Sequence, residues 1–137
     1  MTADFGFQEL SEVYRAEMYS NPLSNPRKDL YRVMADLLID ARRECLALEA
    51  EDPESMLLIG ARERRSKAEM MVKQISFLRA RKVYNRALLA ASGLKATLNE
   101  LTPKEERYYN EVFSSNRRHL SVVSDYMDPK ETSDEIG

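Results

Sequence analysis

The residue types that most often perform chemistry are scarce in this chain of 137 residues, and they lie apart. His119 is the only histidine and Cys45 the only cysteine. An ordinary zinc site needs several His, Cys or carboxylate ligands close together, which a single histidine without such neighbours does not provide. The four glycines form no phosphate-binding loop, and no Glu-x-x-His pair of the di-iron type occurs. We therefore expect no catalytic residue, no cofactor and no metal site, and predict that the protein is not an enzyme.

The two exceptional residues have simpler roles. Cys45 falls on the apolar face of a predicted helix, so we expect a small buried hydrophobic residue rather than a nucleophile. With no second cysteine there is no disulfide, which fits a reducing, intracellular setting. His119 is expected at the surface. The sequence contains no apolar stretch long enough to cross a membrane, and we predict a cytoplasmic protein.

Charge is strongly segregated although the net charge is only -2. Between residues 61 and 86 there are nine basic residues and two acidic ones; the basic residues are Arg62, Arg64, Arg65, Lys67, Lys73, Arg79, Arg81, Lys82 and Arg86. The first four of these could contact DNA phosphates or a partner. We favour the alternative, a solvated surface with salt bridges to acidic flanks, because the chain as a whole is acidic.

These basic residues belong to a long helix predicted from Ala61 to Gly93. At the helical angle of about 100° per residue, one apolar stripe comprises Ala68, Met71, Val72, Ile75 and Leu78. The same side then carries Arg79, Lys82 and Arg86. Each of these three side chains needs a carboxylate or carbonyl partner if it is buried, and we predict paired, structural roles for them.

A second apolar stripe runs along roughly the opposite side of the same helix. A helix that is apolar on two sides needs two partners. It is also long, because about 31 residues at 1.5 Å each extend about 45 Å, whereas a compact chain of this size has a radius of gyration of about 14 Å. We therefore predict a subunit interface that includes Met70, Phe77, Arg79, Arg81, Tyr84 and Leu88. The alternative is a bent helix wrapped by its neighbours inside a monomer.

Four further helices are predicted, a short one directly before the long helix among them, and no strand. The first begins near Asp4 and ends before Ser20, a loop with two prolines follows, and the second helix covers about 27–50. Asp36, Asp40 and Glu44 on its flank are candidates to meet the basic residues. The last helix begins at Thr102, with Pro103 in its first turn and Glu105 placed for a capping box, and ends before Asp128.

Between the second helix and the long helix, the sequence predicts a boundary followed by a short, buried helix. Asp52 is expected to cap a short helix with Pro53 in its first turn. The run 56–59 (Met-Leu-Leu-Ile) is apolar all round and is expected to be buried. Gly60 then predicts a kink or break, although a helix continuous through it remains possible. The fold class is thus all-α, a helical bundle with one long central helix, with a helical domain at 1–127 and an acidic linker or disordered tail at 128–137.

The second half of the chain resembles a known family. The residues that carry the likeness are Arg79-Ala80-Arg81-Lys82-Val83 with Ala87, followed by Leu101-Thr102-Pro103-Lys104-Glu105 with Tyr109. They are similar to the GINS subunits of archaeal and eukaryotic DNA replication, and most to the class in which the helical domain comes first, the archaeal counterpart of the Sld and Psf proteins. The likeness covers about residues 61–123, and the first two helices only by pattern.

The resemblance implies a non-enzymatic scaffold that works in DNA replication. GINS subunits form a tetramer through their helical domains, bind the MCM helicase and a RecJ-like partner, and support helicase activity. The tetramer could contain one kind of subunit or two, and DNA would be met indirectly. Such a protein works at the nucleoid, or in the nucleus of a eukaryote. The alternative function is a small helical nucleic-acid-binding or regulatory module that uses the basic stretch 62–86.

One departure from the family concerns a second domain. Members of this class continue into a small β domain after the helices, whereas Gly137 falls in what reads as the start of the linker. We therefore expect the β domain to be absent here, either because the sequence is a piece of a longer protein or because this member lacks it. Partner binding by such a domain is not expected of these residues.

Overall fold

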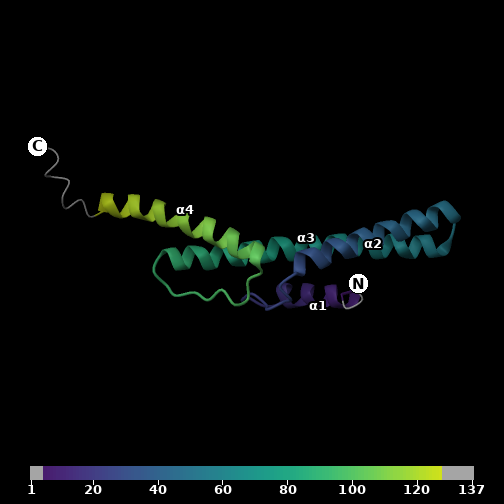
Figure 1. Ribbon diagram of the computed structural model, residues 1–137, viewed down its shortest axis with the longest axis horizontal. Coiled ribbons are helices and arrows are strands. Elements are labelled where there is room, and N and C mark those ends of the chain that lie inside the picture. Colours follow the sequence, from purple (N-terminus) through teal and green to yellow (C-terminus); the bar gives the residue numbers. More distant parts are fainter. Residues whose placement is uncertain (1–4, 128–137) are drawn as a thin grey trace, which may run out of the picture. The chain divides into compact units, whose positions relative to one another are not determined.

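The computed structural model describes residues 5–127, and every regular element in that range is an α-helix (Figure 1). The helices are α1 (Phe7–Met18), α2 (Leu30–Glu51), α3 (Met56–Ala91) and α4 (Pro103–Met127). The prediction of an all-α chain is confirmed. Two predicted features, the cap at Asp4 and the tail at 128–137, lie outside the described residues.

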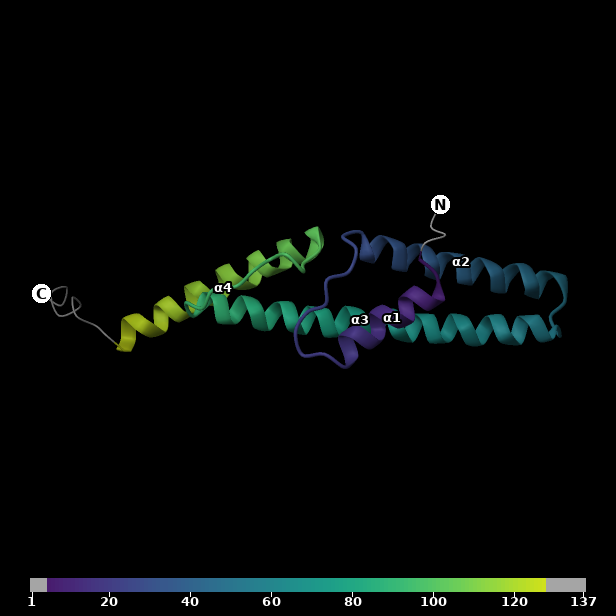
Figure 2. The ribbon, with the colours of Figure 1, turned by 90° about the horizontal axis from the view of Figure 1, so that it is seen from below.

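The chain divides into two units, Met1–Lys82 and Val83–Gly137. In the first unit, α2 runs antiparallel to the first part of α3, and α1 lies against α3 (Figure 2). Their apolar faces meet in one core to which each helix contributes: Leu10 from α1, Leu30, Val33 and Met34 from α2, and Ala68, Met71 and Ile75 from α3. The 3.6-residue periodicity of the sequence therefore identified this core correctly.

The ends of α1 and α2 differ slightly from prediction. The N–H of Gly6, the residue before α1, donates to Glu9 Oε1 at 2.7 Å, which satisfies one of the free donors of the helix start. α2 begins at Leu30 rather than at residue 27. Cys45 is buried near the other end of α2, where it packs with Leu58 and Ala61 of α3.

The turn between α2 and α3 corrects two expectations. Ser55, not Asp52, caps the helix, because its Oγ accepts the N–H of Leu57 at 3.1 Å. Gly60 does not break α3, which is continuous over 36 residues. A glycine costs about 1 kcal/mol in a helix interior, and the packing of its neighbours Leu58 and Ala61 against α2 offsets that cost.

In the second unit, the end of α3 and the start of α4 follow the sequence closely. Gly93 has a φ of 110°, and the N–H of Leu94 reaches back to the carbonyl of Leu89 at 3.1 Å, as in a Schellman C-cap. At α4, the N–H of Thr102 donates to Glu105 Oε1 at 3.0 Å, and the N–H of Glu105 donates to Thr102 Oγ1 at 3.3 Å. The predicted capping box is therefore present, and both of its residues are buried.

Candidate interaction surface

The most buried polar group in the first unit is an ion pair between α1 and α3. The side chains of Glu17 and Arg79 are completely inaccessible to solvent, and Arg79 Nη1 donates to Glu17 Oε2. Arg79 also donates to the carbonyl of Ser24 at 3.2 Å, while the Ser24 hydroxyl donates to the Glu17 carboxylate. The pairing predicted for Arg79 is confirmed, with Glu17 as a partner that the sequence pattern did not identify.

Lys82 completes this buried network one turn further along α3. Its ammonium lies 2.9 Å from Glu17 Oε1 and donates to the carbonyls of Glu17 and Ser20 at 2.8 and 2.7 Å. Two cations thus share one carboxylate, and they hold the end of α1 and the following loop against α3. Among the described residues, no buried side-chain polar atom is left without a hydrogen-bond partner.

The charge state of Glu17 follows from these contacts. Burial alone raises the pKa of a carboxyl group, because it removes water from the charged form. Hydrogen bonds from Ser24, Lys82 and Arg79, together with the charge of Arg79, outweigh burial here, and the pKa of Glu17 lies below its ordinary value of 4.5. The Glu17 carboxyl is therefore ionised at neutral pH, and its contacts connect α1 to α3.

A second, more exposed pair lies in the second unit. Arg86 Nη1 donates to Glu100 Oε1 and to the carbonyl of Thr97, both at 2.8 Å. The hydrogen bond from Arg86 lowers the pKa of Glu100. The contacts attach the 92–102 connection to the last turns of α3, and they confirm the paired role predicted for Arg86.

The opposite face of α3 carries large apolar side chains that the described residues leave exposed. In the first unit, Phe77 is 61% and Met70 45% exposed, and the guanidinium of Arg81 lies 6.0 Å from the centre of the Phe77 ring. In the second unit, Tyr84 and Leu88 of the same helix are also exposed. We call Met70, Phe77 and Arg81, all in the first unit, the outer face of α3. The second stripe predicted from the sequence is thus present and accessible.

Arg79 was also expected at the subunit interface, and this expectation needs correction. Its side chain is fully buried in the core of its own unit. It lies on the core-facing side of α3, whereas Phe77, two residues earlier, lies about 200° away around the helix. Arg79 therefore has no surface to offer a partner.

The four basic residues at the start of α3 lie at the surface, and three of them have carboxylate partners. Arg62 lies 3.5 Å from Glu49, and Arg64 lies 3.3 Å from Glu44, so two bridges join α3 to α2. Arg65 pairs with Glu69 on α3 itself at 3.0 Å. Lys67 is exposed. The predicted salt bridges to acidic flanks are confirmed for Glu44, while Asp36 instead lies 3.5 Å from Arg32 within α2.

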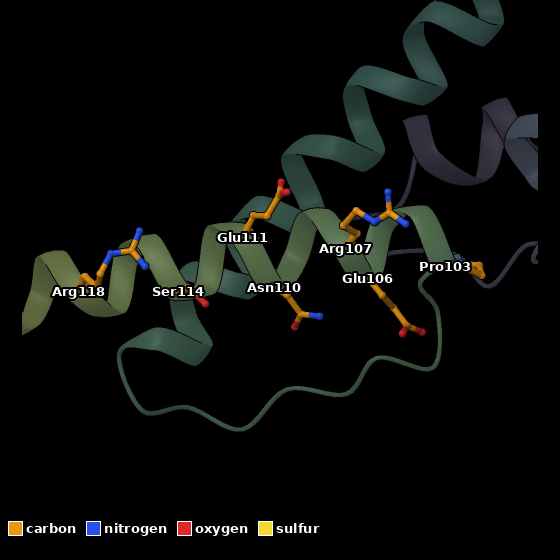
Figure 3. Close-up of a pocket in the computed structure, with 7 residues that line it drawn as sticks. All are labelled: Pro103, Glu106, Arg107, Asn110, Glu111, Ser114 and Arg118. Carbon is orange, nitrogen blue, oxygen red and sulfur yellow. The ribbon is translucent and has the colours of Figure 1, made fainter.

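One surface hollow of the described residues lies along α4 and holds no convergent set of chemical groups. Figure 3 shows this hollow, where the side chains lie along the helix and do not converge on one point; they belong to Pro103, Glu106, Arg107, Asn110, Glu111, Ser114 and Arg118. Within residues 5–127, no three His, Cys, Asp or Glu side chains group in a way that could hold a metal. His119 is exposed. No helix in this part of the chain is both long and apolar enough to span a membrane.

Sequence reasoning missed one surface. The run 56–59 was predicted to be buried, but Met56, Leu57 and Ile59 are 79%, 70% and 51% exposed, and only Leu58 is buried. The reason is position: α3 begins here, at the end of the α2–α3 hairpin, and α2 covers a single side of it (Figure 2). Periodicity could not reveal this, because a run that is apolar all round gives no preferred face.

Comparison of the chain with protein-family models, with curated proteins and with solved structures found no match. The structure itself gives the class of protein: residues 5–127 form an all-α fold whose longest helix is apolar on two sides.

Proposed function

We propose that this chain is a non-catalytic assembly subunit that binds other helical subunits through the outer face of α3. The observation that carries the proposal is the exposure of Phe77 in the middle of a regular helix. Burying a phenylalanine in an interface contributes about 1.5–3 kcal/mol, and aromatic residues are enriched at the centres of interfaces. Met70, two turns earlier on the same helix, extends the apolar surface.

The resemblance to GINS subunits specifies the assembly. Under this proposal the protein is a scaffold subunit of a GINS-like tetramer in DNA replication, and it supports a replicative MCM helicase together with a RecJ-like partner. It would then work in the cytoplasm at the nucleoid, or in the nucleus of a eukaryote. The support is the matching series from Arg79 to Tyr109, in which Arg79, Val83, Ala87 and Thr102 are all buried.

Replacement of Phe77 tests the assembly proposal. Phe77→Glu places a charge in the proposed interface, and we expect the dissociation constant of the oligomer to rise at least about 100-fold, since about 3 kcal/mol corresponds to that factor. The measurement is molar mass by light scattering over a dilution series. Tyr126→Glu is the matched control, because Tyr126 is equally aromatic and even more exposed but lies on α4. Equal effects of the two substitutions would contradict the proposal.

The alternative, a nucleic-acid-binding module, rests on the exposed basic residues at the start of α3. It is less favoured because Arg62, Arg64 and Arg65 already lie beside carboxylates. It predicts an affinity for duplex DNA that falls steeply with salt and is abolished by charge reversal at these three positions. Under the assembly proposal, short duplex DNA binds weakly and the triple variant keeps the oligomer mass.

A further inference from the structure

The end of the α2–α3 hairpin presents an apolar surface distinct from the outer face of α3. We call residues 51–59 the hairpin end. Three of its large apolar side chains are more than half exposed: Met56, Leu57 and Ile59. Successive helical residues are separated by about 100°, so these side chains extend around the helix rather than along one stripe. Leu57 lies on nearly the opposite side of the helix from Phe77, whereas Ile59 lies on the same side, about five turns earlier.

This exposure occurs on a well-defined turn. The N–H of Ser55 donates to the carbonyl of Asp52 at 3.1 Å, and Asp52 Oδ1 accepts the N–H of Glu54 at 3.1 Å. Ser55 then caps α3, and Leu58 is fixed against Cys45 of α2. The backbone that carries the apolar side chains is therefore fixed before any partner arrives, which lowers the entropy cost of binding.

The charges beside this surface indicate what could cover it. Three exposed carboxylates precede the apolar residues, those of Glu51, Asp52 and Glu54. Within residues 5–127, no ion pair involves any of them, whereas Glu44 and Glu49 earlier on α2 pair with arginines of α3. The hairpin end thus combines an apolar surface with uncompensated negative charge, and the complementary ligand combines apolar and basic side chains.

We propose that the hairpin end is a docking site for a basic amphipathic helix of another protein. Leucine or similar apolar side chains of the partner helix contact Met56, Leu57 and Ile59. Lysines or arginines of the same helix lie beside Glu51, Asp52 and Glu54. Symmetric pairing with the hairpin end of a second copy is unfavourable, because it places carboxylates against carboxylates. An anionic membrane is repelled for the same reason.

The test uses the whole chain and a synthetic peptide probe. An amphipathic helical peptide of leucine and lysine is titrated into methyl-labelled protein, with a leucine–glutamate peptide of the same pattern as the comparison. We expect the lysine peptide to shift the methyl signals of Met56, Leu57 and Ile59, with an affinity that falls as salt rises. The glutamate peptide should bind at least about tenfold more weakly.

Two variants locate the binding, and a third serves as control. The first variant combines Glu51→Lys with Glu54→Lys, and the second combines Met56→Ser with Leu57→Ser. Each should lower the affinity for the lysine peptide at least about tenfold. The oligomer mass and melting temperature should stay unchanged. Tyr126→Ser with Met127→Ser removes an equally exposed apolar pair from α4 and should have no effect. Three results would overturn the proposal: shifts centred outside residues 51–59, equal binding of both peptides, or hairpin-end signals that change with protein concentration alone.

Discussion

Phe77 and Arg79 lie two residues apart on α3, and their environments are the reverse of what their chemistry suggests. The aromatic ring is 61% exposed, while the guanidinium is completely buried. Burial of Arg79 is possible because Glu17 and Ser24 are already in place to receive it. Phe77 has the Arg81 guanidinium beside its ring, 6.0 Å from the centre, but most of its surface stays in water, and this is why we assign it to a partner. We call the buried side of α3, which carries Arg79, its finished face. The exposed opposite side, which carries Phe77, is its unfinished face.

Loss of Arg79 should be the most damaging change to the finished face. Arg79→Met leaves the Glu17 carboxylate buried with Lys82 and Ser24 only, and breaking a buried pair on one side costs about 3–5 kcal/mol. We expect a loss near the lower figure, measured as the free energy of unfolding in urea. Lys67→Met, at an exposed position of the same helix outside the outer face, should cost less than about 0.5 kcal/mol. Similar losses in the two variants would contradict the contrast between the faces.

Lowering the pH should reduce the stability that the Glu17 network gives to the finished face of α3. The pKa of Glu17 is lowered in the folded state, so the unfolded chain binds more protons as the pH falls. The stabilisation is fully present above the ordinary value of 4.5 and is lost as the pH drops below it, through the folded-state pKa. Between pH 7 and 3, the free energy of unfolding in urea should therefore fall more steeply for the native chain than for Glu17→Gln. Parallel pH profiles would show that Glu17 does not contribute this dependence.

The capping box of α4 provides a prediction of intermediate size. Thr102→Ala removes the acceptor of the Glu105 N–H inside a buried helix start, which should cost about 1 kcal/mol, within the usual range of about 0.5–2 kcal/mol for such caps. Ser121→Ala, at an exposed position within α4, should change stability by less than about 0.5 kcal/mol. Thermal or urea unfolding measures both variants, and an unchanged Thr102→Ala protein would rule out a stabilising cap.

The smallest effect is expected for Arg86. Its pair with Glu100 is partly exposed, and such pairs contribute about 0–1 kcal/mol. Arg86→Met should therefore destabilise the chain far less than Arg79→Met, although both substitutions remove an arginine–glutamate pair from α3. Raising the salt concentration should reduce the Arg86 effect and leave the Arg79 effect nearly unchanged. A loss of several kcal/mol in the free energy of unfolding of Arg86→Met that does not change with salt would contradict this prediction.

Much of the fold could be predicted from the sequence, because its signals are local. Periodicity located the four helices, Gly93 marked the end of α3, and Thr102 with Glu105 marked the start of α4. The same periodicity showed that Arg79 would share a face with core residues and would need a partner. These features depend on side-chain spacing within one helix, which the sequence contains directly.

What could not be predicted depends on how helices meet. Glu17 was not recognised as the partner of Arg79, since it comes from another helix 62 residues away. Met56, Leu57 and Ile59 were assigned to the core because nothing in a uniformly apolar run says where its neighbour ends. Gly60 was given too much weight as a breaker, because packing of Leu58 and Ala61 supports the helix on both sides of it.

The most direct test of the unfinished face is the molar mass of the native chain in solution. Size-exclusion chromatography with light scattering, at two protein concentrations and two salt levels, should give a dimer or larger oligomer that persists on dilution. An interface of apolar side chains should also be little affected by salt. A chain that is strictly monomeric at tens of micromolar under both salt conditions would contradict the proposal that the outer face of α3 is an assembly surface.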